Sequence, residues 1–134
     1  MTPFRPGERL LTELDAARLR KLRPGGPPPP LLAHLLDEAD VVAPQAIPPD
    51  VVTMYAQFVI HDERTDQRQT LVLCYPADAE PAKGFISVLS PAGLGLIGLP
   101  VGAQARWAGP GGEETVARIE AILFQPEATG DYLT

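Results

Sequence analysis

The residues of this chain best suited to covalent or metal chemistry are Ser90, Cys74 and the two histidines, His34 and His61. Ser90 precedes a sharp turn, as a nucleophile in a Gly-x-Ser-x-Gly elbow would, but that motif needs glycine where Val88 stands. Cys74 lies in an apolar run, so we expect a buried packing thiol rather than a reactive thiolate. The histidines lack metal-ligand spacing. These residues predict no catalytic site, no metal and no cofactor.

Phosphate binding is the other chemistry that a glycine-rich sequence suggests. Gly109–Gly112 lacks the lysine and the following helix of a phosphate-binding loop, so we interpret it as a turn. The second glycine-rich segment, Ile86–Gly102, predicts a particular backbone conformation and not a phosphate-binding site. Ile86–Leu89 favours a short buried strand, Ser90 can cap a helix, and Pro91 suits its first position because it has no N–H to satisfy. We therefore interpret Ser90 as a helix cap.

Three further glycines in this segment constrain the predicted corner between strand and helix. Gly93 and Gly95 lie inside the short helix, where each costs roughly 1 kcal/mol relative to alanine. Such a cost indicates that a side chain is excluded so that another backbone can approach. Gly98 stands where a left-handed residue ends a helix.

Two short helices are predicted before the β-rich part of the chain. Thr12–Asp15 resembles the capped start of a first helix, which Pro24–Pro30 would end. The apolar side of this helix is formed by Leu11, Leu14, Leu19 and Leu22. A second helix begins beside Pro30 and stops before Pro44, with an apolar side of Leu32, Leu35, Leu36 and Ala39. At about 1.5 Å per residue, roughly ten residues span only about 15 Å, so this helical hairpin is short.

From Asp50 the apolar pattern alternates, which predicts strands. One face of the first strand is formed by Val52, Met54, Ala56, Phe58 and Ile60. A charged turn over His61–Gln69 and a strand over Thr70–Tyr75 complete an antiparallel hairpin, and Pro76–Gly84 is a loop. Ala103–Ala108 can form another strand.

The segment Glu113–Gln125 fits two patterns. Val116, Ile119 and Leu123 follow a helical stripe, whereas Ala117, Ile119, Ala121 and Leu123 alternate as in a strand. We choose the strand because the glycine-rich turn before it indicates a hairpin.

Composition limits the possible partners. The 134 residues carry a formal charge of −6, which argues against direct binding of nucleic acid, since phosphate contacts need clustered lysine and arginine. The basic residues Arg18, Arg20, Lys21 and Arg23 form the one such cluster, which we interpret as the solvated last turn of a helix. The apolar runs are too short to cross a bilayer and no secretory signal precedes them, so we expect a cytoplasmic protein that does not bind membranes.

The segment Ser90–Gly102 resembles the Ser-Pro-x-Gly-x-x-Leu-Ile-Gly-x-x-Val-Gly signature of the Gre transcript-cleavage factors. Within that superfamily the chain resembles the regulator of nucleoside diphosphate kinase (Rnk) family. The blocks that carry this likeness are Asp50–Met54, Leu73–Ala79, Ile86–Pro91 and Gln125–Tyr132. The resemblance implies an α+β fold, with an FKBP-like antiparallel β-sheet and one short helix after the helical hairpin. It also places a strand over Glu113–Gln125, and it divides the chain into residues 1–46 and 47–134.

The resemblance implies a regulator that is not an enzyme. Gre factors insert a long coiled coil into the secondary channel of RNA polymerase and hold catalytic Mg²⁺ with acidic residues at its tip. The tip expected here, Lys21–Pro30, has no Asp or Glu, and the helices are too short to span the channel, so we expect no transcript cleavage. Binding of RNA polymerase at the rim of the secondary channel, in competition with Gre-type factors, remains as the expected function.

The resemblance implies that the docking surface consists of Ser90, Pro91, Gly93, Leu94 and Gly98, with Leu94 exposed beside the glycines. Alternatively, these residues only build the corner. The polar segment Gln125–Tyr132 either packs back over the sheet or contacts a partner. Two other functions stay open: binding of a metabolic enzyme such as nucleoside diphosphate kinase, and a prolyl isomerase-like activity suggested by the fold. The chain has few of the aromatic residues that line isomerase pockets.

Overall fold

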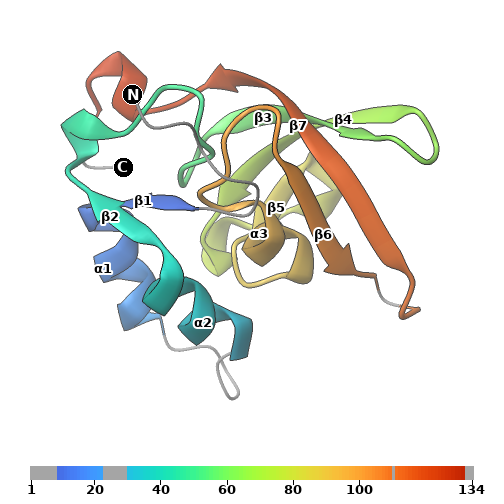
Figure 1. Cartoon of the computed structure of the whole chain (residues 1–134), viewed down its shortest axis with the longest axis horizontal. Helices are drawn as coiled ribbons and strands as arrows, with labels where there is room; N and C mark the ends of the chain where they lie inside the picture. The colour runs from blue at the N-terminus through green and yellow to red at the C-terminus, as the bar shows by residue number, and fades with distance from the viewer. Residues whose placement is uncertain (1–8, 23–29, 110, 132–134) are drawn as a thin grey trace.

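The computed structural model describes residues 9–22, 30–109 and 111–131, and within them a curled five-stranded sheet lies beside short helices (Figure 1). The strand order in the sheet is β5-β4-β3-β7-β6. These strands are β3 (Gln57–Asp62), β4 (Gln67–Cys74), β5 (Phe85–Ser87), β6 (Gln104–Ala108) and β7 (Glu114–Phe124). The α-helices are α1 (Glu13–Lys21), α2 (Pro30–Glu38) and α3 (Pro91–Leu96). The α+β fold is as predicted.

The sheet is mixed rather than wholly antiparallel. The predicted hairpins β3–β4 and β6–β7 are antiparallel, and β3 also pairs antiparallel with β7. In contrast, β5 runs parallel to β4, with Phe85 opposite Val72. The loop between these strands contains two 3₁₀ turns, Pro76–Asp78 and Pro81–Lys83, and brings the chain back along β4 before β5 begins. A crossover of this kind, unlike a tight hairpin, gives parallel pairing.

The segment Glu113–Gln125, which fitted both a helix and a strand, contains strand β7. It is hydrogen-bonded on both sides, to β3 and to β6, and Ala117 and Ile119 are both fully buried. A residue in such a central strand satisfies its backbone groups through its two neighbours, and this outweighs the local preference for helix.

The segment before β3 differs from the prediction. Val52, Met54 and Ala56 are fully buried, as expected, but the strand begins at Gln57 and not at Asp50. Val52 exchanges backbone hydrogen bonds with the end of the α3 corner, donating to Leu99 O at 2.9 Å and accepting from Gly98 N at 2.8 Å. Tyr55 then adopts a positive φ of 65°. The alternating apolar pattern predicted the burial of these residues correctly. Their backbone hydrogen bonds, however, are not part of a strand ladder.

The two N-terminal helices form where predicted. Thr12 caps α1 by accepting a hydrogen bond from Asp15 N at 3.0 Å, and α2 begins at Pro30. Leu11, however, belongs to a strand, β1 (Leu10–Thr12), which pairs in parallel with β2 (Asp40–Val42). The β1–β2 ribbon was not predicted, and α2 ends at Glu38, earlier than the predicted end before Pro44. Residues 23–29 of the expected tip lie outside the described residues.

Residues of the helices and the sheet share a hydrophobic core. Leu19 of α1 and Leu32 and Leu35 of α2 belong to the same buried cluster as Phe58 and Ile119 of the sheet. The helices therefore pack against the sheet region, and the division of the chain at residue 46 stays a prediction. Cys74 is fully buried with its Sγ 3.4 Å from Ile86 O, as expected of a packing thiol.

The described part of the C-terminal motif packs back over the chain. The Gln125 side-chain amide donates hydrogen bonds to Pro48 O and Val51 O, each at 2.8 Å. The Thr53 hydroxyl donates to Glu127 Oε1 at 2.7 Å. These polar side chains replace strand pairing for the irregular segment before β3. Tyr132 lies outside the described residues.

Candidate docking site

The predicted cap at the start of α3 is confirmed. Ser90 Oγ accepts a hydrogen bond from Gly93 N at 3.1 Å and donates one to Ser87 O at 2.6 Å. Pro91 is the first residue of the helix. The hydroxyl of Ser90 is thus engaged by the backbone on both sides, which is the role of a cap and not of a nucleophile.

The glycines of the corner admit neighbouring backbone, as predicted. A Cβ at Gly93 would lie 2.1 Å from Ser87 O, and one at Gly95 would lie 3.2 Å from Arg106 O of β6. Gly98 has a φ of +81°, and a Cβ there would lie 2.9 Å from Leu10 O. The approaching backbones all belong to the chain itself, so these glycines pack α3 into the fold.

The predicted exposure of Leu94 is wrong. Leu94 is 2% exposed and belongs to the hydrophobic core, and Gly93 and Gly98 are also buried. Tight packing at the glycines draws the helix so close to the sheet that Leu94 points into the core. Of the five predicted docking residues, Ser90 is half-buried and Pro91 is exposed, so only the start of the helix reaches the surface.

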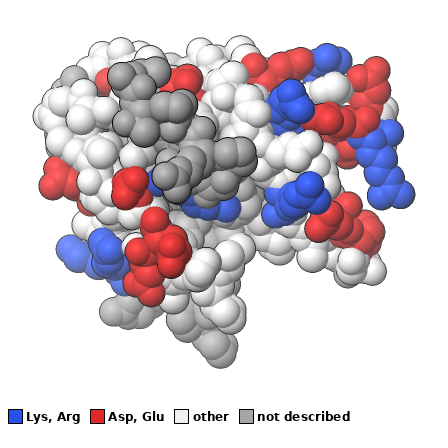
Figure 2. All heavy atoms as spheres, viewed as in Figure 1, with Lys and Arg blue, Asp and Glu red and all other residues white. Residues whose placement is uncertain are grey.

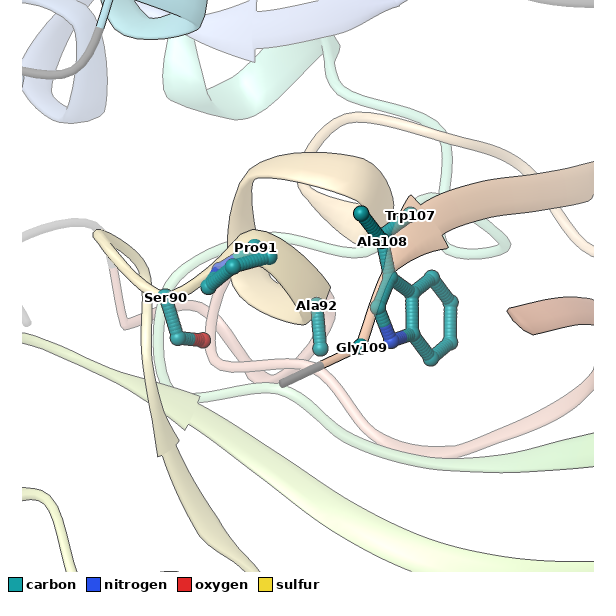
Figure 3. A pocket seen from close by; sticks show the side chains of 6 residues that line it. All are labelled: Ser90, Pro91, Ala92, Trp107, Ala108 and Gly109. Atoms are coloured by element: carbon teal, nitrogen blue, oxygen red, sulfur yellow. The ribbon is translucent and has the colours of Figure 1, made fainter. Parts of the chain in front are cut away.

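A cavity of about 260 Å³ opens beside this start of α3 (Figure 3). We call it the Pro91–Trp107 groove; its lining residues are Ser90, Pro91, Ala92, Trp107, Ala108 and Gly109. Figure 3 shows Ser90 and Pro91 on one side of the opening and the indole of Trp107 on the other, with Ala92 between them. None of the six side chains is acidic or basic. The groove can therefore hold an apolar group, with the indole N–H as a hydrogen-bond donor, but it cannot perform acid–base chemistry.

Trp107, Ala108 and Gly109 were not among the predicted site residues. From the sequence, Gly109 was interpreted as part of a turn. Gly95 did indicate a contact between α3 and another part of the chain, because a glycine inside a helix predicts a close backbone neighbour. That neighbour is β6. The signal does not identify which strand approaches, because no local pattern links α3 to β6.

Charged side chains are interspersed on the face drawn in Figure 2, with acidic and basic groups adjacent. Three ion pairs lie on the sheet and its hairpin turn: Arg68–Glu120 at 2.8 Å, Arg118–Glu63 at 2.9 Å and Arg106–Glu114 at 3.1 Å. Arg18, Arg20 and Lys21 lie in the last turn of α1, as predicted. Among the described residues, no group of three His, Cys, Asp or Glu side chains could hold a metal ion. Within the same residues, no helix has the length and apolar character needed to cross a membrane.

Comparison with known proteins identifies close relatives. The family model for the C-terminal part of the transcription elongation factors GreA and GreB matches residues 47–124. The regulator of nucleoside diphosphate kinase from Escherichia coli K12 is 35% identical over 129 residues, which cover 92% of this chain and 95% of that protein. The elongation factor GreA from Rhodopseudomonas palustris TIE-1 is 30% identical, and the match covers 66% of this chain but only 58% of that protein.

Solved structures of Gre-type factors are similar to this chain as well. A prokaryotic transcription elongation factor GreA/GreB from Nitrosomonas europaea superposes with a TM-score of 0.69 at 33% identity, covering 87% of this chain and 98% of that one. The GreA factor homolog Gfh1 of Thermus thermophilus has a TM-score of 0.51 at 18% identity, over 87% of this chain and 99% of that chain, and indicates a shared fold only.

Proposed function

Because this chain belongs to the GreA/GreB and Rnk family of regulatory factors, we propose that it binds RNA polymerase near the secondary channel and competes there with Gre-type factors. It does so in the cytoplasm, without stimulating transcript cleavage. The observation that carries this proposal is the match of residues 47–124 to the family model of the transcription elongation factors GreA and GreB. The likeness to the Rnk protein extends over 95% of that relative and includes the helical segment before the family domain.

The lengths of the helices support a factor that occupies a site without reaching deep into the channel. α1 and α2 have nine residues each, so each spans only about 14 Å at about 1.5 Å per residue. Both pack against the core of the domain through Leu19, Leu32 and Leu35. A coiled coil that delivers a metal to the polymerase centre must project well beyond its domain, which these helices do not do.

The Pro91–Trp107 groove is the surface that we assign to docking. The family resemblance directs attention to the start of α3, and the groove is where that start is exposed. Its uncharged lining suits an apolar side chain of the polymerase, whose burial would provide affinity without a charged contact.

The test is a transcript-cleavage assay with stalled elongation complexes and a Gre factor. Saturating wild-type protein should lower Gre-stimulated cleavage and stimulate none by itself. Pro91→Glu should abolish the inhibition, because it places a charge in the groove, whereas an acidic residue at a helix start is otherwise tolerated. Ala82→Glu, on an exposed 3₁₀ turn away from the groove, is the matched control and should inhibit normally. Cleavage that saturating wild-type protein leaves unchanged would refute the proposal.

A second candidate is a regulator that binds nucleoside diphosphate kinase, as the name of the Rnk relative suggests. Affinity purification from lysate separates the two: recovery of polymerase subunits favours the first, and recovery of the kinase favours the second. A prolyl isomerase-like activity would appear in a proline-peptide assay, but Trp107 is the one aromatic residue among the six that line the groove.

A further inference from the structure

Arg9 makes two side-chain hydrogen bonds to the end of α3. Its Nη1 donates to Leu94 O at 2.9 Å and to Ile97 O at 2.7 Å. These carbonyls belong to the last turn of the helix and to its C-cap, where backbone acceptors lack partners within the helix and the dipole is negative. Arg9 is half-buried at this contact, and this burial lowers its pKa from the ordinary value. A charged donor held in this way makes stronger hydrogen bonds than a neutral one.

The backbone next to Arg9 strengthens the same contact. Leu10 N donates to Gly98 O at 2.9 Å. A Cβ at Gly98 would lie 2.9 Å from Leu10 O and 3.1 Å from Arg9 Cβ, so only glycine permits this approach. The start of β1 is thus fixed against the exit of α3 by both its backbone and a side chain.

Helix α3 needs such support. It has six residues, two of which are glycines, and a helix of that length does not form alone in water. Ser90 closes its N-terminal end, and Arg9 closes its C-terminal end. Between these ends, Gly95 lies against β6 at Trp107, with a Cβ position 3.3 Å from the indole Cε3. The position of α3 therefore sets the distance between Pro91 and Trp107.

We propose that Arg9 is the positioning residue of the Pro91–Trp107 groove, because it anchors the last turn of α3 and so keeps the groove open in the shape that a partner binds. Arg9, which directly precedes β1, is then part of the docking apparatus, although it contacts the opposite end of α3 from the groove. This inference rests on the proposed function for its partner, RNA polymerase, but the shape of the groove can be measured without any partner.

Trp107 provides that measurement, since it is the only tryptophan of the chain and lines the groove. In Arg9→Ala, release of α3 should increase acrylamide quenching of Trp107 by about a factor of two, while the protein remains folded by circular dichroism. Millimolar guanidinium should restore the wild-type quenching, and urea at the same concentration, which is planar but uncharged, should not. Arg9→Lys keeps the positive charge, but the ammonium is more strongly hydrated than the guanidinium and is less suited to a partly buried contact. Its quenching should therefore fall between those of the wild type and Arg9→Ala.

Two controls separate positioning from general loss of stability. Arg64→Met removes an exposed arginine from the turn between β3 and β4 and should leave quenching unchanged. Ile60→Val removes one buried methylene from β3, outside α3, and lowers the general stability of the protein modestly. It should also leave quenching unchanged well below its unfolding temperature. If Arg9→Ala does not fold, the comparison of Arg9→Lys with Ile60→Val decides the question.

Affinity for core RNA polymerase is the second measurement. Arg9→Ala should bind at least about tenfold more weakly than wild type, with recovery in guanidinium. Wild-type quenching in both Arg9 variants would overturn the inference, whether or not the polymerase binds. Absence of binding by the wild-type protein, with altered quenching in the variants, would refute the proposed function and leave the role of Arg9 in shaping the groove intact.

Discussion

Asp15 makes the stability of this protein depend on pH in a direction that can be worked out. Its side chain is 1% exposed, Oδ2 accepts a hydrogen bond from Met54 N at 3.3 Å, and Oδ1 has no hydrogen-bond partner among the described residues. Burial raises the pKa of Asp15 from 3.8 to about 6, and the charge of Glu127 acts in the same direction, while the bond from Met54 opposes it. The folded protein therefore binds this proton more tightly than the unfolded chain.

The magnitude follows from the two pKa values. The folded and unfolded pKa values differ by about two, and each pKa unit corresponds to about 1.4 kcal/mol. The ionised form of Asp15 therefore destabilises the folded state by about 3 kcal/mol above about pH 6. As the pH falls from about 6 to about 4, the carboxylate is protonated in the folded protein first, so this cost disappears. Below the unfolded pKa the group no longer affects stability.

Asp15→Asn removes the charge and keeps a carbonyl oxygen that can accept from Met54 N. At about pH 7 the variant should be more stable than wild type by up to about 3 kcal/mol, because the charge of the buried carboxylate is removed. The difference should shrink towards zero at about pH 4. Urea unfolding followed by Trp107 fluorescence measures it across this range. Asp37→Asn, at an exposed position on α2, is the matched control.

An Asp15→Asn curve that runs parallel to the wild-type curve from about pH 4 to about pH 7 would refute this reasoning. It would mean that water or a cation already compensates the buried carboxylate.

Two substitutions in the α3 corner test the packing described above. Leu94→Asp places a charge at a position that is 2% exposed, so it should destabilise the protein by about 4 kcal/mol or more, and circular dichroism should show unfolding rather than a folded protein that merely fails to bind. Gly93→Ala should lower the unfolding temperature, at a cost of about 2–4 kcal/mol, because the new Cβ would lie 2.1 Å from Ser87 O. Gly111→Ala is its control, since the nearest atom there is the flexible carboxylate of Glu113, and a near-normal unfolding temperature for Gly93→Ala would contradict the packing.

The sequence predicts best those elements whose signals are local. The cap at Ser90, the left-handed Gly98 and the hairpin turns each depend on a few adjacent residues, and all of them form. The β1–β2 ribbon could not be predicted in the same way, because its strands have three residues each and lie far apart in the chain. Likewise, the burial of Gln125 is decided by distant acceptors, Pro48 O and Val51 O, and its polarity alone indicated exposure.

The candidate site shows the same limit more sharply. A glycine inside a helix predicts that another backbone comes close, but it does not say whether that backbone belongs to a partner or to the chain itself. At Gly93, Gly95 and Gly98 it belongs to the chain, so the glycines pack the corner against the interior of the protein, and Leu94 is buried in the core. The outward surface is left to Pro91, which has no N–H to satisfy and therefore can stand exposed at the first turn. A docking surface on this corner must consequently depend on what lies across from Pro91, which is Trp107, and on whatever holds α3 at that distance.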